Sequence, residues 1–103
     1  MVKLFMLSGE VGPEGAVIGE KGQFMQAIIF QATMDGTLVI YAGGERTASE
    51  EVMDRLAGRT PMNLLLNKLQ MQTNESVEFR FSHPLPITII PSNKVNYVME
   101  AVE

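Results

Sequence analysis

The sequence contains no cysteine and no tryptophan among its 103 residues, and it has a single histidine, His83. Without cysteine, these residues can form no disulfide bond, no thiolate metal site and no cysteine nucleophile. Long apolar runs are also missing, because none approaches the ~18–20 residues that cross a membrane. The apolar run after Lys3 is too short for the core of a signal peptide. We therefore expect no membrane partner and a cytoplasmic location.

Basic residues are few as well. The chain has 8 Lys and Arg against 12 Asp and Glu, which gives a net charge of −4. Binding to nucleic acid needs a basic patch that neutralises phosphates, so no nucleic-acid partner is expected. The content of 46% hydrophobic and 19% charged residues is typical of a globular protein. At this length we expect a single domain over residues 1–103.

Several segments have the composition of β-strands: residues 2–7, 37–42, 77–81 and 87–90. Residues 2–7 are apolar on both faces, which predicts a central strand that is buried on both sides. The alternation in 77–81 predicts a strand with one solvated face. Prolines on both sides of 87–90 predict a strand at the edge or end of a sheet.

Residues 23–34 allow two interpretations. Asp35-Gly36 favours a β-hairpin turn, which would make the segment a strand. The apolar residues, however, share one face of a helix: Phe24, Met25, Ile28, Ile29 and Ala32. Gln, Met and Ala are also better helix formers than strand formers. We expect a helix here, with the hairpin as the alternative.

Further helices are expected in the second half. Thr47 and Glu50 form a capping box that starts a helix ending near Gly58. Thr60-Pro61 starts the next helix, over 61–71, with the apolar stripe Met62, Leu65, Leu66 and Leu69. Ser92 is expected to cap a closing helix that carries Val95, Val98, Met99 and Val102 on one side. The predicted fold is an α/β or α+β domain of order β-α-β-α-α-β-β-α, with a four-stranded mixed sheet.

Glycines punctuate residues 9–22, which we expect to form a long loop that is functional or mobile. If the first two strands are parallel neighbours, this loop and the glycine pair after the second strand meet at one sheet edge, where α/β domains bind ligands. The expected ligand- or partner-binding residues are Gly9, Gly12, Gly15, Gly43, Gly44 and Arg46. The glycine spacing differs from the phosphate-binding and dinucleotide motifs.

Short motifs of the first half also carry a family likeness: Leu7-Ser8-Gly9-Glu10-Val11, Leu38-Val39-Ile40-Tyr41, Gly43-Gly44 and Thr47-Ala48. Together they resemble the opening βαβα unit of Clp-type serine proteases and their phage capsid-protease relatives. In that family the glycine pair belongs to the oxyanion loop. No serine matches the family's nucleophile, so the resemblance implies a relative or interaction module without protease activity.

Groups suited to catalysis or metal binding are sparse. Ser82 or Ser8 with His83 as base would be a minimal hydrolase, but the neighbours Ser82 and His83 point apart on an extended chain. The acidic cluster of Glu50, Glu51 and Asp54 follows a helix start, where the helix dipole favours carboxylates. We expect no catalytic residue, no metal and no cofactor.

The expected function is that of a non-enzymatic interaction or assembly module, acting as a homo-oligomer or as a small regulatory partner. The apolar face of 61–71 is wider than one packing interface needs, so Leu64 and Met71 are the predicted interface residues. One alternative is a small-ligand protein that binds an anion or nucleotide at the 9–22 loop and the Gly43-Gly44 turn. The other is a degenerate serine-hydrolase-like protein.

Overall fold

The computed structural model describes residues 3–43, 53, 56–58 and 65–103. Every element whose ends lie in these ranges is a β-strand. The strands are β1 (Leu4–Val11), β2 (Ala16–Ile18), β3 (Phe24–Ala32), β4 (Gly36–Ala42), β5 (Leu65–Met71), β6 (Ser76–Phe79), β7 (His83–Pro84), β8 (Ile87–Pro91) and β9 (Val95–Val102). The expected helix from Thr47 and the expected helix start at Pro61 lie outside the described residues, apart from Met53 and residues 56–58.

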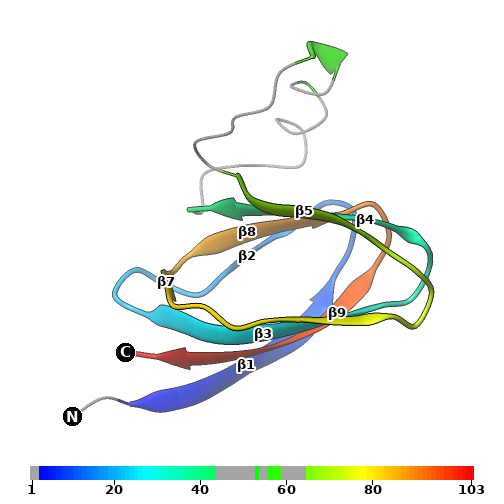
Figure 1. The fold of residues 1–103 in the computed structure, drawn as a ribbon. Coiled ribbons are helices and arrows are strands. Elements are labelled where there is room, and N and C mark those ends of the chain that lie inside the picture. The colour runs from blue at the N-terminus through cyan, green and yellow to red at the C-terminus, as the bar shows by residue number, and fades with distance from the viewer. Residues whose placement is uncertain (1–2, 44–52, 54–55, 59–64) are drawn as a thin grey trace.

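The strands form two sheets that pack face to face (Figure 1). Sheet A has the order β1-β9-β3-β6, with β7 also paired to β3, and sheet B has the order β2-β8-β4-β5. Every described strand pair is antiparallel. The expected α/β or α+β fold with a mixed sheet is therefore wrong. The described strands form a β-sandwich, in which the inner faces of both sheets supply the core.

Residues 23–34 form β3 and the start of the turn to β4, so the hairpin alternative is right and the expected helix is wrong. In the pairing of β3 with β9, the register shifts between Met25 and Ala27. This β-bulge inserts one residue, so the next core-facing residue after Met25 is Ile28. The buried residues that follow this pattern are Met25, Ile28, Phe30 and Ala32. The step of three residues across the bulge is what resembled a helical face.

The same effect explains β5, which occupies part of the expected 61–71 helix. Tyr41 lies opposite Leu65 whereas Ile40 lies opposite Asn67, so Leu66 is an extra residue in β5. Leu66 and Leu69 both pack against the core. Their helix-like spacing arises from a bulge in a strand, and the helix expectation is wrong over residues 65–71.

The last expected helix is strand β9, which lies between β1 and β3 in sheet A. Its core-facing residues recur at every second position: Val95, Tyr97, Met99 and Ala101. Val and Tyr favour strands over helices. Ser92 does not cap a helix, because its hydroxyl accepts a hydrogen bond from the N–H of Thr37 at 2.8 Å.

Strands are confirmed at residues 4–11, 36–42, 76–79 and 87–91, but two of them lie elsewhere in the sheets than expected. β8 is a central strand between β2 and β4, although prolines flank it. β1, expected to be central, is an edge strand of sheet A. The middle of the core comprises Phe30, Leu38, Ile40, Ile87 and Met99, each at most 2% exposed.

Residues 9–22 do not form the expected long loop. β1 continues to Val11, a turn at residues 12–15 follows, and Ala16–Ile18 forms β2. In the turn, the N–H of Gly15 donates to the carbonyl of Gly12 at 2.9 Å. Gly15 has a φ of +81°, a conformation that side chains disfavour. Gly12 and Gly15 therefore build a tight turn between β1 and β2.

Candidate interaction surface

The outer face of sheet A, which points away from sheet B, carries large apolar side chains that the chain leaves exposed. We call them the outer-face patch: Leu4, Met6, Phe24, Ile29 and Val98, each between 42% and 60% exposed. Directly opposed residues in an antiparallel pair share a face of the sheet. Val98 lies opposite Ile29, and Val102 lies opposite both Leu4 and Phe24. The patch therefore extends across β1, β9 and β3.

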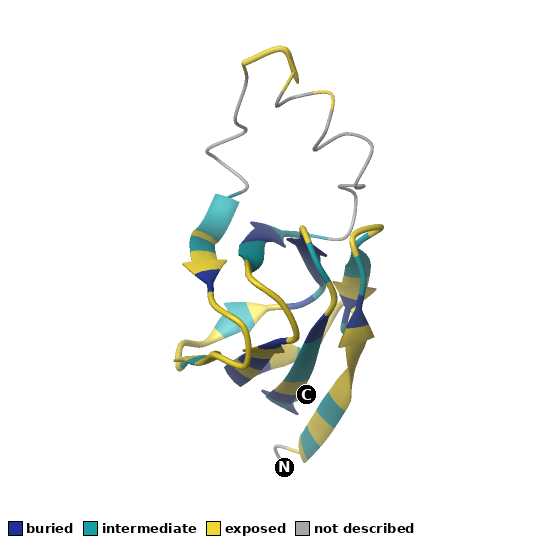
Figure 2. Cartoon of the chain, turned by 90° about the vertical axis from the view of Figure 1, so that its right-hand side faces the viewer, coloured by how far each residue is buried: buried dark blue, intermediate teal, exposed yellow. Residues whose placement is uncertain are grey.

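Strand β1 brings two of these residues to the margin of the molecule. Its residues alternate, because Phe5 and Leu7 pack against the core while Leu4 and Met6 are each 60% exposed on the outer face. Figure 2 shows this alternation of exposed and intermediate residues along the strand that begins at the N-terminus. The pattern that predicted a central strand is therefore that of an edge strand with an apolar outer face.

The second property of β1 is a free edge. Within the described residues, β1 is hydrogen-bonded to β9 alone, which leaves the backbone groups along its other side available. Edge strands are usually protected by proline, by lysine or by other charges. β1 contains no proline, and its one charged residue, Glu10, forms an ion pair with Lys94 at 3.1 Å. Residues 4–9 thus combine an unprotected edge with an apolar face.

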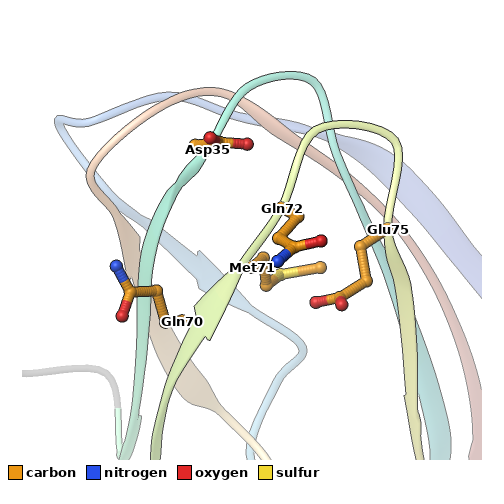
Figure 3. A pocket seen from close by; sticks show the side chains of 5 residues that line it. All are labelled: Asp35, Gln70, Met71, Gln72 and Glu75. Carbon is orange, nitrogen blue, oxygen red and sulfur yellow. The ribbon is translucent and has the colours of Figure 1, made fainter.

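A different kind of site lies at one end of the sandwich, where the turn after β3 meets the turn after β5. Side chains from the two turns and from β5 line a pocket of about 400 Å³: Asp35, Gln70, Met71, Gln72 and Glu75 (Figure 3). Two carboxylates and two amides surround it, so it is unsuited to an anion. This disfavours nucleotides and phosphates at this end.

Asp35 holds the turns at this end together. Its Oδ1 accepts hydrogen bonds from the backbone N–H of Thr73 at 2.7 Å and from the Thr73 hydroxyl at 2.9 Å. Its carbonyl accepts a third from the side-chain amide of Asn93 at 2.7 Å. The backbone and then the hydroxyl bond of Thr73 lower the pKa of the Asp35 carboxyl from its ordinary value of 3.8. The Asp35 carboxylate therefore links the turn after β3 to the turn after β5.

The sequence-predicted binding glycines do not meet at one site. Val11, just before Gly12, lies opposite Val95 at the start of β9, whereas Ala42, just before Gly43, lies opposite Ile87 at the start of β8. β8 runs toward β9, so the 12–15 turn and Gly43 lie at opposite ends of the sandwich. Gly9 lies within β1 beside the ring of Tyr97.

The remaining predicted site residues divide into two groups. Gly44, Arg46 and Leu64 lie outside the described residues. Met71, a predicted interface residue, is only 2% exposed, and its side chain belongs to the core. A binding role for any of these residues, and for the glycines above, stays a prediction. Sequence reasoning missed the outer-face patch, although the apolar outward residues of 2–7 were the signal for it.

The residues considered for hydrolysis are not arranged as a catalytic pair. The Nδ1 atom of His83 lies 2.7 Å from the carbonyl of Pro84, and the hydroxyl of Ser82 accepts from the amide of Gln26 at 3.4 Å. Ser8 lies opposite Val98 on the outer face of sheet A. Across the described ranges, no three His, Cys, Asp or Glu side chains cluster as metal ligands, and Glu50, Glu51 and Asp54 lie outside those ranges.

Comparison with known proteins places the fold. No family model matches the chain, and no curated protein matches its sequence. Among solved structures, a chain described under "Bacillus endospore appendages form a novel family of disulfide-linked pili" matches with a TM-score of 0.53. The match covers 99% of this chain and 85% of that chain, at 10% sequence identity. The chain thus shares the fold of an appendage protein.

This finding corrects two expectations. The resemblance to Clp-type serine proteases is wrong, because that family opens with a βαβα unit and this chain forms two antiparallel sheets instead. The comparison does not support the expected cytoplasmic location either, since the solved protein that shares the fold is described from appendages of Bacillus endospores. In the described part of the chain, no helix is long and apolar enough to cross a membrane.

Proposed function

We propose that the chain is a non-enzymatic structural subunit that binds further copies of itself through the outer-face patch and the free edge of β1. The observation that carries the proposal is the coincidence of the two on one strand. A large exposed apolar patch marks a contact surface, and an unpaired edge strand is a template for pairing with another chain. Neither feature is explained by the packing of the described chain.

The energetics support contact between copies. Burying a Leu, Met, Val or Ile side chain stabilises by roughly 1.5–3 kcal/mol. The patch supplies several such side chains, and pairing along β1 adds backbone hydrogen bonds. These gains together are of the size needed to offset the ~4–15 kcal/mol that association costs in lost freedom.

The fold likeness suggests what the assembly is. The solved protein with this fold belongs to disulfide-linked pili. We extend assembly into an extracellular appendage to this chain as part of the proposal. Because its 103 residues include no cysteine, disulfides within this sequence cannot link the copies. The contacts would be non-covalent, so thiol reductants should leave the assembly unchanged.

Which free edge pairs with β1 determines whether the assembly is closed or open. If β1 pairs with β1 of a second copy, the contact is two-fold symmetric and closes as a dimer. β5 is also paired on one side alone in the described structure, and it lies on the opposite margin from β1. If β1 pairs with β5 of the next copy, the contact is heterologous and propagates. The second arrangement builds an appendage from a single kind of contact.

The test compares Met6→Glu with Met34→Glu. The two methionines are 60% and 58% exposed, but Met34 lies in the turn after β3, away from the patch. In sedimentation velocity over a concentration series, we expect wild type and Met34→Glu to form large species. Met6→Glu should raise the dissociation constant roughly tenfold or more, because a charge would be buried in the contact.

A wild-type protein that stays monomeric at every concentration would contradict self-association. Equal behaviour of the two variants would contradict the assigned surface. Chemical denaturation of both variants controls for folding. No observation favours the small-ligand alternative, because its predicted glycines lie at opposite ends of the sandwich and the described pocket is lined by carboxylates.

A further inference from the structure

The methionines among the described residues fall into two structural classes. Met25, Met71 and Met99 are at most 2% exposed and belong to the core. Met6, Met34 and Met53 are 60%, 58% and 64% exposed. Of these exposed methionines, Met6 alone belongs to the outer-face patch. Met6 is therefore accessible to oxidants in the single chain, and the proposed contact buries it between two copies. Oxidation of Met6 therefore changes that contact.

We infer that Met6 is an oxidation site that regulates self-association, with a peroxide as the oxidant. The inference rests on the proposed function. A sulfur lone pair of Met6 attacks one peroxide oxygen, the O–O bond breaks, and a sulfur–oxygen bond forms. The sulfur loses two electrons, and the departing hydroxide takes up a proton to leave as water. The product is methionine sulfoxide, which is polar where the thioether was apolar.

The position of Met6 gives this change its effect. Met6 lies opposite Glu100, whose side chain already interrupts the apolar rows of the patch. A sulfoxide beside it extends the polar interruption to the β1 margin, where the free edge must be desolvated in pairing. Oxidation of Met6 also has to occur before the subunit joins an assembly. Oxidation acts on free subunits, because a copy in contact covers Met6, so peroxide blocks addition of subunits rather than dismantling an assembly.

The first experiment uses Met34 as an internal standard. The protein is treated briefly with hydrogen peroxide below and above the concentration at which it associates, and the sulfoxide at each methionine is measured by peptide mass mapping. Because Met6 and Met34 have nearly equal exposure in the single chain, their oxidation rates should be similar at low concentration. At high concentration Met6 should be protected several-fold relative to Met34. Equal rates at both concentrations would overturn the inference.

The second experiment separates the methionines by substitution. Wild type, Met34→Leu and Met6→Leu are each compared with themselves before and after peroxide, using sedimentation velocity. We expect peroxide to raise the dissociation constant roughly tenfold in wild type and in Met34→Leu, because the sulfoxide removes most of the transfer free energy of the side chain. Met6→Leu should show no change on treatment.

Failure of this inference is distinct from failure of the proposed function. If Met6→Glu prevents association but peroxide does not weaken it, Met6 lies in the contact and is not a regulatory site. If peroxide weakens Met6→Leu as strongly as wild type, another methionine is responsible and the inference is overturned. If no variant or wild type associates at all, both proposals fall.

Discussion

The outer faces of the two sheets differ in how their apolar residues are covered. On sheet B, Val39, Tyr41 and Ile90 alternate with core residues and therefore face away from sheet A, yet they are at most 6% exposed. Leu65 packs against them. On sheet A, Ile29 and Val98 face outward in the same way and are 42% and 43% exposed.

The comparison shows that apolar residues on an outer face have different roles, depending on whether they are buried within the described chain. Both faces carry β-branched residues at outward positions, so their sequence patterns are alike. On sheet B these residues form a second apolar cluster within the chain, and their burial stabilises the fold. On sheet A the described residues supply no such cover, and under the proposed self-association the same residue types add stability when a second copy binds. The difference predicts that matched substitutions on the two faces have different consequences.

The largest expected effect separates two valines. Val39→Asp places a charge where the side chain is 3% exposed, and it should lower the free energy of unfolding by about 4 kcal/mol or more. Val98→Asp, at 43% exposed, should cost less than about 1 kcal/mol but weaken self-association. Urea denaturation and sedimentation velocity measure the two effects. Similar losses of stability in both variants would contradict the comparison.

A milder pair tests packing without charge. Ile90→Ala should destabilise by about 2–4 kcal/mol, because it opens a cavity in the cluster on sheet B. Ile29→Ala removes the same atoms from an exposed position, so about 1 kcal/mol or less is expected. The midpoint of urea denaturation gives both values at an unchanged m-value. If Ile29→Ala proves the more damaging, sheet A is covered in solution by something that stabilises it.

The smallest effect concerns acid, which acts on the fold through Asp35 in the turn between β3 and β4. The pKa of Asp35 is lowered in the folded protein, first by the backbone N–H of Thr73 and then by its hydroxyl. Asp35 therefore contributes stability above its ordinary pKa of 3.8, and this is lost as the pH falls through the lower folded value.

In thermal unfolding, Asp35→Asn should thus lose less stability than wild type between pH 5 and pH 2 (about the range over which a carboxyl titrates). The control is the same pair of proteins at pH 7, where wild type should have the higher midpoint. Parallel pH curves for the two proteins would show that the Asp35–Thr73 hydrogen bonds do not stabilise the folded state.

Local pattern was sufficient at two regular strands, although not at β9, a regular strand for which a helix was expected. The alternation in 77–81 and the apolar run of 37–42 identified β6 and β4, because side chains of a regular strand alternate between two faces. Pattern failed at β3 and β5, where bulges at Gln26 and Leu66 convert a spacing of two into a spacing of three. A spacing of three is also typical of one face of a helix. Only the pairing with a neighbouring strand shows whether the segment is a helix or a bulged strand.

The sequence signal for the outer-face patch was ambiguous for a related reason. An apolar strand such as 2–7 is compatible with burial on both faces or with one face left for a partner, and neighbours along the chain do not decide between them. Its place at the edge of sheet A depends on pairing with β9, about ninety residues later in the chain. The expectation that the glycines would meet at one ligand site shared this limit, since convergence of distant residues is a tertiary property.

The amino-acid sequence by itself determined that this chain has enough apolar residues for a core, no cysteine, several strong strand segments and a net negative charge. These are local or compositional properties, set by side-chain volume, backbone freedom and charge. Tertiary structure alone decided which apolar residues are inside, which strand is an edge and where the turns meet. Burial and strand pairing depend on contacts between residues far apart in the chain, so no single segment shows how much these contacts stabilise the fold.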